Sequence, residues 1–267
     1  MRKQITSTQN VFIKELFQLK EKARNRKYTQ TFLIEGLREI NLALKGGYII
    51  QTILIDVSLI SENDIEHLIE NSSTTIDVIE ISNDVYKKLA LRETTEGILA
   101  ISKTKELALH HIQFKNKNPL ILVAEAPEKP GNIGALLRTA DAAGIDAVII
   151  ANPKTDIYNP NIIRSSVGCV FTVPIATGTT TEVISFLKEN NINIYGAALT
   201  ASVEYQTIDY KQASAIVVGT EATGLSDDWL LNTAKNIVIP MRGAIDSMNV
   251  SVSAAIILFE AVRQRAL

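Results

Sequence analysis

The chain has 267 residues, 46% of them hydrophobic and 21% charged, and its formal net charge at pH 7 is −2. This balance excludes an intrinsically disordered chain and leaves enough length for two domains that each bury a core. A single cysteine excludes an intrachain disulfide, and three histidines with one thiol argue against a zinc site. No apolar run reaches the roughly 18 residues of a membrane helix. We therefore expect a cytoplasmic protein.

The first 50 residues are basic, with ten Lys or Arg against four Glu. Apolar spacing predicts a helix over residues 11–23, and the densest basic cluster, KEKARNRK, occupies residues 20–27. Such a cluster suits phosphate binding, although the solvated face of an amphipathic helix has a similar composition. Nucleic-acid contact is the hypothesis for four of its side chains: Lys20, Lys22, Arg24 and Lys27.

Helices and strands continue to alternate as far as residue 103. Short apolar runs predict strands over residues 32–34, 49–55, 76–81 and 97–101. Amphipathic spacing predicts helices over residues 37–44, 62–70 and 84–91. The next stretch, 104–118, is polar and typical of a linker with room for a short helix. We therefore expect a small α/β domain over 1–103, a linker over 104–118 and a second domain over 119–267.

The second domain contains five short apolar runs separated by segments long enough for helices. The runs are LILVA, AVII, INIYG, AIVVG and NIVIP, in that order. LILVA and AIVVG are apolar at almost every position, which is typical of strands that are buried on both faces of a sheet. This pattern predicts a parallel α/β sheet.

Three glycine-containing segments follow or contain strands of this sheet. They are PGNIGALLRTADAAG from Pro130, VVGTEATGLS from Val217, and IPMRGAIDSMNVSVSAAIILFEAVRQ from Ile239. Ligands of open α/β sheets bind at the carboxyl ends of strands, so these segments predict a site. The segment after LILVA lacks G-x-G-x-x-G, and the chain has no phosphate-binding loop of the GxxxxGK type, which argues against both common nucleotide-binding folds.

Several residues of these segments have both a structural and a functional interpretation. Asn132, Glu221 and Asn249 are each placed to cap a helix, or to line a site. Arg138 lies among small residues, and burying its charge is costly unless it meets a carboxylate or a phosphate, so we favour a functional role. Gly219 is expected to bring its backbone close to a ligand through a tight turn.

The three segments resemble the three motifs of the SpoU/TrmH family of RNA ribose methyltransferases, within the SPOUT superfamily. The first segment matches at Asn132, Gly134, Arg138, Thr139 and Ala140. The second matches at Gly219, Glu221, Gly224 and Leu225. The third matches at Ile239, Pro240, Met241, Gly243, Ser247, Asn249, Val250 and Ser251, and continues to Glu260 and Arg263. Met248 stands where the family usually has leucine, a change that conserves volume and apolarity.

The resemblance implies a fold, a reaction and a set of site residues. The implied fold is a SPOUT-type parallel sheet with a C-terminal deep trefoil knot, preceded by a smaller, ribosomal-protein-like α/β domain that binds the substrate, in a homodimer. The implied reaction is methyl transfer from S-adenosylmethionine to a ribose 2′-hydroxyl of structured RNA, without a metal. The implied catalytic residues are Asn132, Arg138, Glu221, Ser247 and Asn249; the cofactor residues are Leu199, Gly219, Ile239 and Met248; Arg164 is an RNA contact.

Two other functions remain open from the sequence. A SPOUT base methyltransferase is expected to lack the S-x-N-V-S pattern of residues 247–251, and an RNA-binding or ribosome-assembly factor would not need these polar groups together in one pocket. A complete N-terminal domain favours ribosomal over transfer RNA as the substrate. The sequence names neither the RNA nor the nucleotide.

Overall fold

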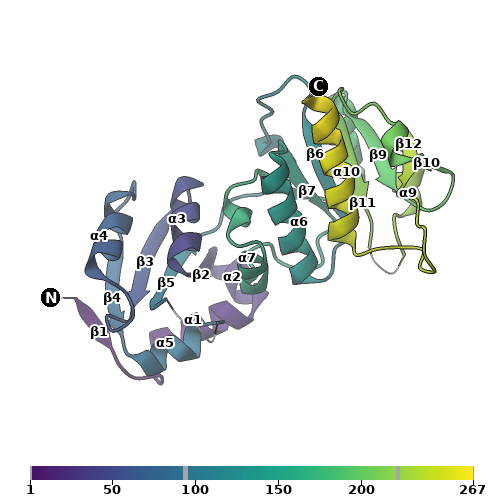
Figure 1. Cartoon of the computed structure of the whole chain (residues 1–267). Coiled ribbons are helices and arrows are strands. Elements are labelled where there is room, and N and C mark those ends of the chain that lie inside the picture. Colours follow the sequence, from purple (N-terminus) through teal and green to yellow (C-terminus); the bar gives the residue numbers. More distant parts are fainter. Residues whose placement is uncertain (1, 93–95, 221–222, 267) are drawn as a thin grey trace. The chain divides into compact units, whose positions relative to one another are not determined.

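The computed structural model describes residues 2–92, 96–220 and 223–266. The chain forms two compact units (Figure 1). Unit 1 comprises Met1–Glu106 and Asp156–Thr172, and unit 2 comprises Leu107–Thr155 and Val173–Leu267. The segment Asp156–Thr172 therefore packs with unit 1 although it lies in the second half of the sequence, and the chain crosses between the units three times.

Unit 1 is built on a mixed sheet of five strands. The strand order is β1-β4-β3-β5-β2, and β5 runs antiparallel to both of its neighbours. The strands are β1 (Lys3–Ile5), β2 (Thr31–Glu35), β3 (Ile50–Ile55), β4 (Asp77–Ile81) and β5 (Ile98–Lys103). The four strands predicted in this region are confirmed, and β1 was not predicted because three residues carry too little periodicity.

The helices of unit 1 are short and mostly capped by polar side chains. They are α1 (Val11–Glu21), α2 (Ala23–Thr29), α3 (Leu37–Lys45), α4 (Glu62–Glu70), α5 (Asn83–Leu89) and α7 (Pro160–Ser165). The single helix predicted over 11–23 is wrong at its end, because Lys22 is extended (φ −118°, ψ 116°) and separates α1 from α2. Apolar side chains of α1 and α5 pack on the sheet to form the core.

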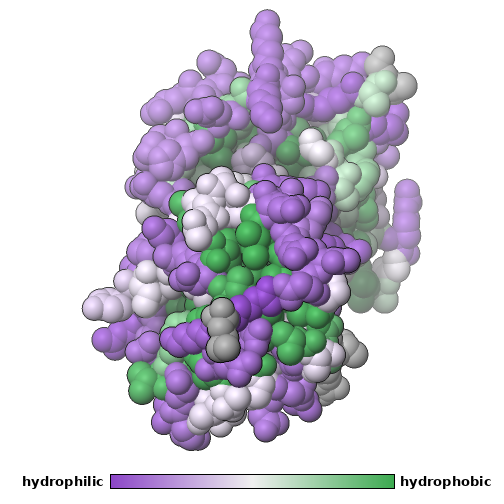
Figure 2. Space-filling view, turned by 90° about the vertical axis from the view of Figure 1, so that its left-hand side faces the viewer, coloured by the Kyte–Doolittle hydropathy of each residue, from purple (hydrophilic) through white to green (hydrophobic). Residues whose placement is uncertain are grey.

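The face in Figure 2 is largely hydrophilic, with hydrophobic side chains gathered in its middle.

Aromatic side chains fasten the segment Asp156–Thr172 to unit 1. Tyr158 stacks on Phe32 of β2 with 4.4 Å between ring centroids. Phe171 lies edge-on to Tyr48 at 5.0 Å. All four rings are buried, so the segment is part of the core of this unit.

Unit 2 is built on a fully parallel sheet of seven strands, as the apolar runs predict. The order is β10-β12-β9-β11-β6-β7-β8. The strands are β6 (Leu120–Glu125), β7 (Ala147–Ala151), β8 (Ile175–Gly178), β9 (Asn193–Ala197), β10 (Ser202–Glu204), β11 (Ser214–Val218) and β12 (Lys235–Val238). All five predicted strands are present, and the two that were not predicted, β8 and β10, lie at the edges.

Helices cover both faces of this sheet. They are α6 (Pro130–Ala143), α8 (Thr180–Glu189), α9 (Asp227–Leu230) and α10 (Val250–Arg265), with the one-turn helices η1 (Leu109–His111) and η3 (Tyr205–Thr207). Helices α6 and α10 lie side by side (Figure 1), and α8 packs with α9, whose Trp229 is buried in the core. Over the described residues, no helix is long and apolar enough to cross a membrane.

Candidate active site

A pocket of about 690 Å³ opens where three neighbouring strands of unit 2 end. Its walls begin at the last residues of β9, β11 and β12 and continue into the loops that follow them. The remaining wall comes from residues 246–250 and the first turns of α10. This is the edge of a parallel sheet at which ligands are expected.

The four residues expected to hold the cofactor all line this pocket: Leu199, Gly219, Ile239 and Met248. Ser247 and Asn249, two of the expected catalytic residues, line it as well. The lining combines apolar side chains with the backbone of two loops, which is the usual composition of a small-molecule site. Segments that are far apart in the sequence thus meet around one cavity.

Gly219 is required by the backbone of its own loop. A Cβ atom at this position would lie 2.1 Å from the carbonyl carbon of Gly224. Thr220 and Gly224 exchange two backbone hydrogen bonds of 3.1 Å, which hold the loop closed, and Gly224 has a positive φ of 68°. We expected the missing side chain of Gly219 to leave room for a ligand, and this needs correction. The space that a Cβ would occupy is filled by the backbone of Gly224. Glu221, in the same loop, lies outside the described residues.

A buried carboxylate holds the far end of this loop. Glu125, the last residue of β6, accepts hydrogen bonds from the backbone N of Ser226 (2.8 Å) and from its Oγ (2.6 Å). It also accepts one from Thr180 Oγ1 at 3.3 Å, and Asn152 Nδ2 donates to the same hydroxyl at 2.8 Å. The sequence analysis missed Glu125, although an acidic residue at the end of a buried strand is an uncommon signal.

Asn249 has both of the roles considered for it. Its Oδ1 accepts from Ser251 N at 2.9 Å and so caps α10. Its Nδ2 donates to Oδ1 of Asn132 at 3.2 Å, which joins the first glycine-containing segment to the third. Asn132 does not cap its helix, because α6 begins at Pro130 and Lys129 is the N-cap residue.

Arg138 is exposed on α6, so the expectation of a costly buried charge was wrong. Over the described ranges its guanidinium has no hydrogen-bond or ion-pair partner, and it does not line the pocket of its own chain. Its donors are therefore not taken up by any side chain or backbone group that the structure describes.

The four basic residues expected to contact RNA fall into two groups. Lys22, Arg24 and Lys27 are exposed. Lys20 has a side chain that is only 10% exposed, its Nζ donates to the carbonyls of Lys88 (3.1 Å) and Ala90 (3.3 Å), and it lies over the ring of Phe17. Lys20 thus supports the packing of α1 on α5, which removes it from the basic surface.

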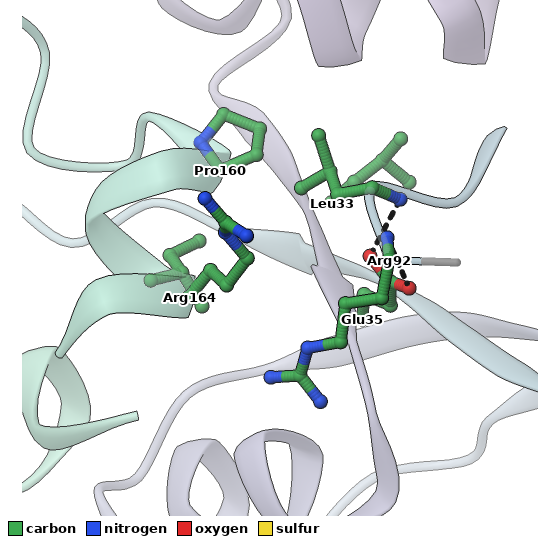
Figure 3. A pocket seen from close by; sticks show the side chains of 7 residues that line it. Leu33, Glu35, Arg92, Pro160 and Arg164 are labelled. Atoms are coloured by element: carbon green, nitrogen blue, oxygen red, sulfur yellow. Dashed lines mark hydrogen bonds between the residues drawn. The ribbon is translucent and has the colours of Figure 1, made fainter. Parts of the chain in front are cut away.

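Arg164 lies in unit 1, at a small recess lined by Leu33, Glu35, Leu91, Arg92, Pro160 and Ile163. Figure 3 shows it on α7 with Pro160, and dashed lines mark the hydrogen bonds that the Glu35 carboxylate accepts. The Glu35 carboxylate accepts from the backbone N–H groups of Leu91 and Arg92 at 2.7 and 3.2 Å. Burial nevertheless raises the pKa of Glu35 above its ordinary value.

The neighbouring carboxylate of Glu39 is completely buried. Arg92 Nη2 donates to it at 2.6 Å and Arg38 Nη2 at 3.1 Å. Burial alone would raise its pKa, but the hydrogen bonds from the two arginines lower it below the ordinary value. These charges are paired within unit 1. Among the residues that the structure describes, no group of three or more His, Cys, Asp or Glu side chains is placed to hold a metal ion.

Comparison with known proteins identifies two regions of the chain. Residues 119–259 match the model of the SpoU rRNA Methylase family. Residues 10–100 match the model of the MRM3-like substrate binding domain. These ranges correspond to the site-bearing half of the sequence and to most of the N-terminal half.

Similar proteins match along nearly the whole chain. The 23S rRNA (guanosine(2553)-2′-O)-methyltransferase RlmP of Bacillus subtilis is 32% identical over 257 residues, which cover 96% of this chain and 98% of RlmP. A solved RNA 2′-O ribose methyltransferase is 38% identical, with a TM-score of 0.85 and coverage of 99% and 100%. The SpoU methyltransferase AviRb of Streptomyces viridochromogenes, solved with AdoMet, is 27% identical, with a TM-score of 0.88 and coverage of 97% and 99%.

The family model covers more than half of the chain and includes every described residue of the pocket. The resemblance first read from three short segments thus extends to the sheet that carries them, and the chain belongs to the SpoU rRNA methylase family.

Proposed function

We propose that this protein transfers a methyl group from S-adenosylmethionine to a ribose 2′-hydroxyl of ribosomal RNA. The observation that carries the proposal is the meeting of the second and third motif segments around one pocket, with Asn249 bonded to Asn132 of the first. The relatives named 2′-O-methyltransferases of 23S rRNA support ribosomal RNA as the substrate.

The pocket fits a donor of this kind. Its volume of about 690 Å³ lies within the range of small-molecule sites. Leu199, Ile239 and Met248 supply apolar walls for an adenosine, and the backbone around Gly219 supplies hydrogen-bonding groups that are not hidden by a side chain. When bound, S-adenosylmethionine supplies a methyl carbon that its sulfonium already activates, so the protein has to align the hydroxyl and manage one proton.

Different residues of this chain orient the ribose and stabilise the charge that develops on its 2′-oxygen. Ser247 and Asn249 form the pocket wall next to Asn132 and orient the ribose there. Arg138 grips the phosphate beside the target ribose and stabilises the alkoxide that develops on the 2′-oxygen. A guanidinium has no acceptor capacity at neutral pH, which favours this electrostatic role over proton abstraction. Glu221 orders the same site.

Two copies of the chain form the active enzyme in this proposal. Val252 and Phe259 on α10 are 47% and 48% exposed, whereas Ala254, Ile257 and Leu258 of the same helix are buried in unit 2. An apolar stripe opposite the core side of a helix suits a second copy. A homodimer also supplies a second pocket for the exposed Arg138. We further propose that the loops after β11 and β12 form the deep trefoil knot of the superfamily.

Unit 1 recruits the RNA in this proposal, through the exposed Lys22, Arg24 and Lys27 and through Arg164. Side chains of this kind neutralise phosphates without reading the sequence. The bacterial relatives that act on ribosomal RNA support a cytoplasmic location for this protein.

The proposal is tested by incubating the dimer with methyl-labelled S-adenosylmethionine and a 23S rRNA transcript, then digesting the RNA to nucleosides. We expect the label in a 2′-O-methylated nucleoside. Label in a base would favour base methylation. Calorimetry separates the remaining alternative, because an assembly factor with a degenerate pocket would bind the transcript and not the donor.

A further inference from the structure

We propose that Tyr28, with Arg24 and Lys27 on the same helix, is a stacking platform for an unpaired base of the RNA substrate. This inference rests on the proposed role of unit 1 in RNA recruitment. Tyr28 belongs to α2 and is 89% exposed, so both faces of its ring are open to solvent. The other Phe and Tyr residues in the described part of unit 1 are buried or half-buried.

The helix that carries Tyr28 is fixed from its inner side. Arg26 is 3% exposed, and its Nη1 donates to the carbonyls of Leu19 and Lys20, each at 2.8 Å. Its Nε pairs with Asp156 of the segment that packs into this unit. Residues two apart on a helix point about 200° away from each other, so an anchored Arg26 directs Tyr28 outward.

The end of α2 is fixed as well. Thr29 Oγ1 donates to the carbonyl of Asn25 at 2.9 Å, and Gln30 Nε2 donates to the carbonyl of Lys27 at 2.6 Å. Thr104 Oγ1 donates to Gln30 Oε1 at 3.0 Å, which ties the turn to the strand end after β5. The backbone under Tyr28 is therefore ordered before any ligand arrives, which lowers the entropy cost of binding.

Two exposed cations belong to the same helix as Tyr28. Arg24 lies four residues before Tyr28, on the same face of the helix, and Lys27 is its neighbour in sequence. Both are exposed. Arg26, the buried cation of this helix, is the one that pairs with Asp156. An aromatic ring near exposed cations offers a face for a base and charges for the phosphates on either side of it.

This arrangement favours an unpaired base over duplex RNA. The faces of bases within a helix are covered by their neighbours, so a protruding ring has nothing to stack on. Bases in loops and bulges present free faces, and sequence-tolerant stacking contributes roughly 1–3 kcal/mol per base. Stacking on Tyr28 thus favours RNA with unpaired bases over duplex RNA and does not discriminate between the four bases.

The test measures the affinity of the full-length protein for a short oligoadenylate and for a blunt RNA duplex of equal length. Tyr28→Ala should weaken oligoadenylate binding roughly tenfold and leave duplex binding within about twofold. Tyr28→Trp should bind oligoadenylate at least as tightly as the parent protein. Val57→Ala is the matched control, because Val57 is an apolar residue of unit 1 that is 58% exposed and should not change either affinity.

Three outcomes decide between the platform and the wider proposal. Unchanged oligoadenylate affinity in Tyr28→Ala, with clear losses in Arg24→Ala and Lys27→Ala, would overturn the platform and leave RNA recruitment by unit 1 intact. An equal loss on duplex and single strand would also overturn it, because the ring would then support the backbone contacts only. No change in any of these variants would overturn both, and would direct attention to a protein partner for this surface.

Discussion

The recess of unit 1 and the pocket of unit 2 differ in what their polar groups contact. In unit 1, Arg92 and Glu39 neutralise each other, and Glu35 accepts from two backbone N–H groups. In unit 2, Arg138 keeps its donors free over the described ranges, and Asn249 faces the pocket. Charges that are paired inside the protein are already satisfied, whereas an exposed arginine without a partner among the described residues can meet a substrate phosphate.

The same distinction separates the two kinds of basic residue near the N-terminus. Lys20 donates to two backbone carbonyls, and Arg26 donates to two more and pairs with Asp156, so both maintain the fold. Arg24 and Lys27 are exposed on the same short helix. The basic cluster therefore contains residues that hold the fold together and residues that are exposed to a ligand. The sequence alone does not distinguish the two kinds.

The largest expected effect is at Arg138. Arg138→Ala should lower turnover by about two to four orders of magnitude, because an electrostatic group that acts in the transition state is removed. Donor affinity by calorimetry should stay within about threefold, since Arg138 is proposed to contact the RNA phosphate and the developing alkoxide and not the donor. Arg138→Lys should restore little, because a point charge does not replace a planar fork. Near-normal turnover of the lysine variant would contradict this role.

Gly219→Val should weaken donor binding by about a hundredfold or more. The new Cβ would lie 2.1 Å from the backbone of Gly224, so the pairing of Thr220 with Gly224 must open and the pocket wall must move. Circular dichroism should show a folded protein. Gly131→Ala is the control, because nothing lies within 4 Å of a Cβ there. Parental affinity in Gly219→Val would mean that this loop does not shape the donor site.

Glu39→Gln should destabilise unit 1 by about 3 kcal/mol, because it removes the buried charge partner of Arg92 and leaves only the longer ion pair with the exposed Glu96. Folding lowers the pKa of Glu39, so its contribution is present above the ordinary carboxyl pKa and is lost as the pH falls through the lowered value of the folded protein. Urea unfolding at neutral and acidic pH measures this. The difference between parent and variant should shrink in acid, and Arg38→Ala, which removes an exposed partner, should cost less than about 1 kcal/mol.

Glu125→Ala should weaken donor affinity about tenfold while affecting turnover at saturating donor much less. The buried carboxylate fixes Ser226, which closes the loop after Gly219, and its removal leaves these hydrogen-bond donors unsatisfied. Glu125→Gln keeps one acceptor oxygen and should recover part of the affinity. A fall in turnover with unchanged donor affinity would argue for a direct part in the reaction.

The smallest effects are expected on RNA affinity. Replacing Lys22, Arg24 and Lys27 by Glu should lower the slope of log affinity against log salt by about 0.7–0.9 for each RNA phosphate that the protein no longer neutralises, with donor binding unchanged. Lys20→Met should lower the melting temperature and leave the slope as it is. A reduced slope in Lys20→Met would show that this residue reaches RNA after all.

The sequence predicts most of the architecture, because short continuous apolar runs such as LILVA and AIVVG are a local property. The resemblance to the family motifs, and not the local pattern, implied that Leu199, Gly219, Ile239 and Met248 belong to one site, and all four line the pocket. The sequence does not predict the break at Lys22, because the residues around Lys22 favour a continuous helix although its backbone is extended. It also misses the packing of Asp156–Thr172 with unit 1, because aromatic contacts between distant segments leave no periodic signal.

In our proposal, the pocket of unit 2 serves ribose methylation of ribosomal RNA. The most direct measurement is a map of 2′-O-methylation across the 23S rRNA of cells that carry the parent gene, no copy, or the Arg138→Ala variant. We expect one modified ribose that is present with the parent protein and absent in the other two strains. An identical map in all three strains would contradict the proposal.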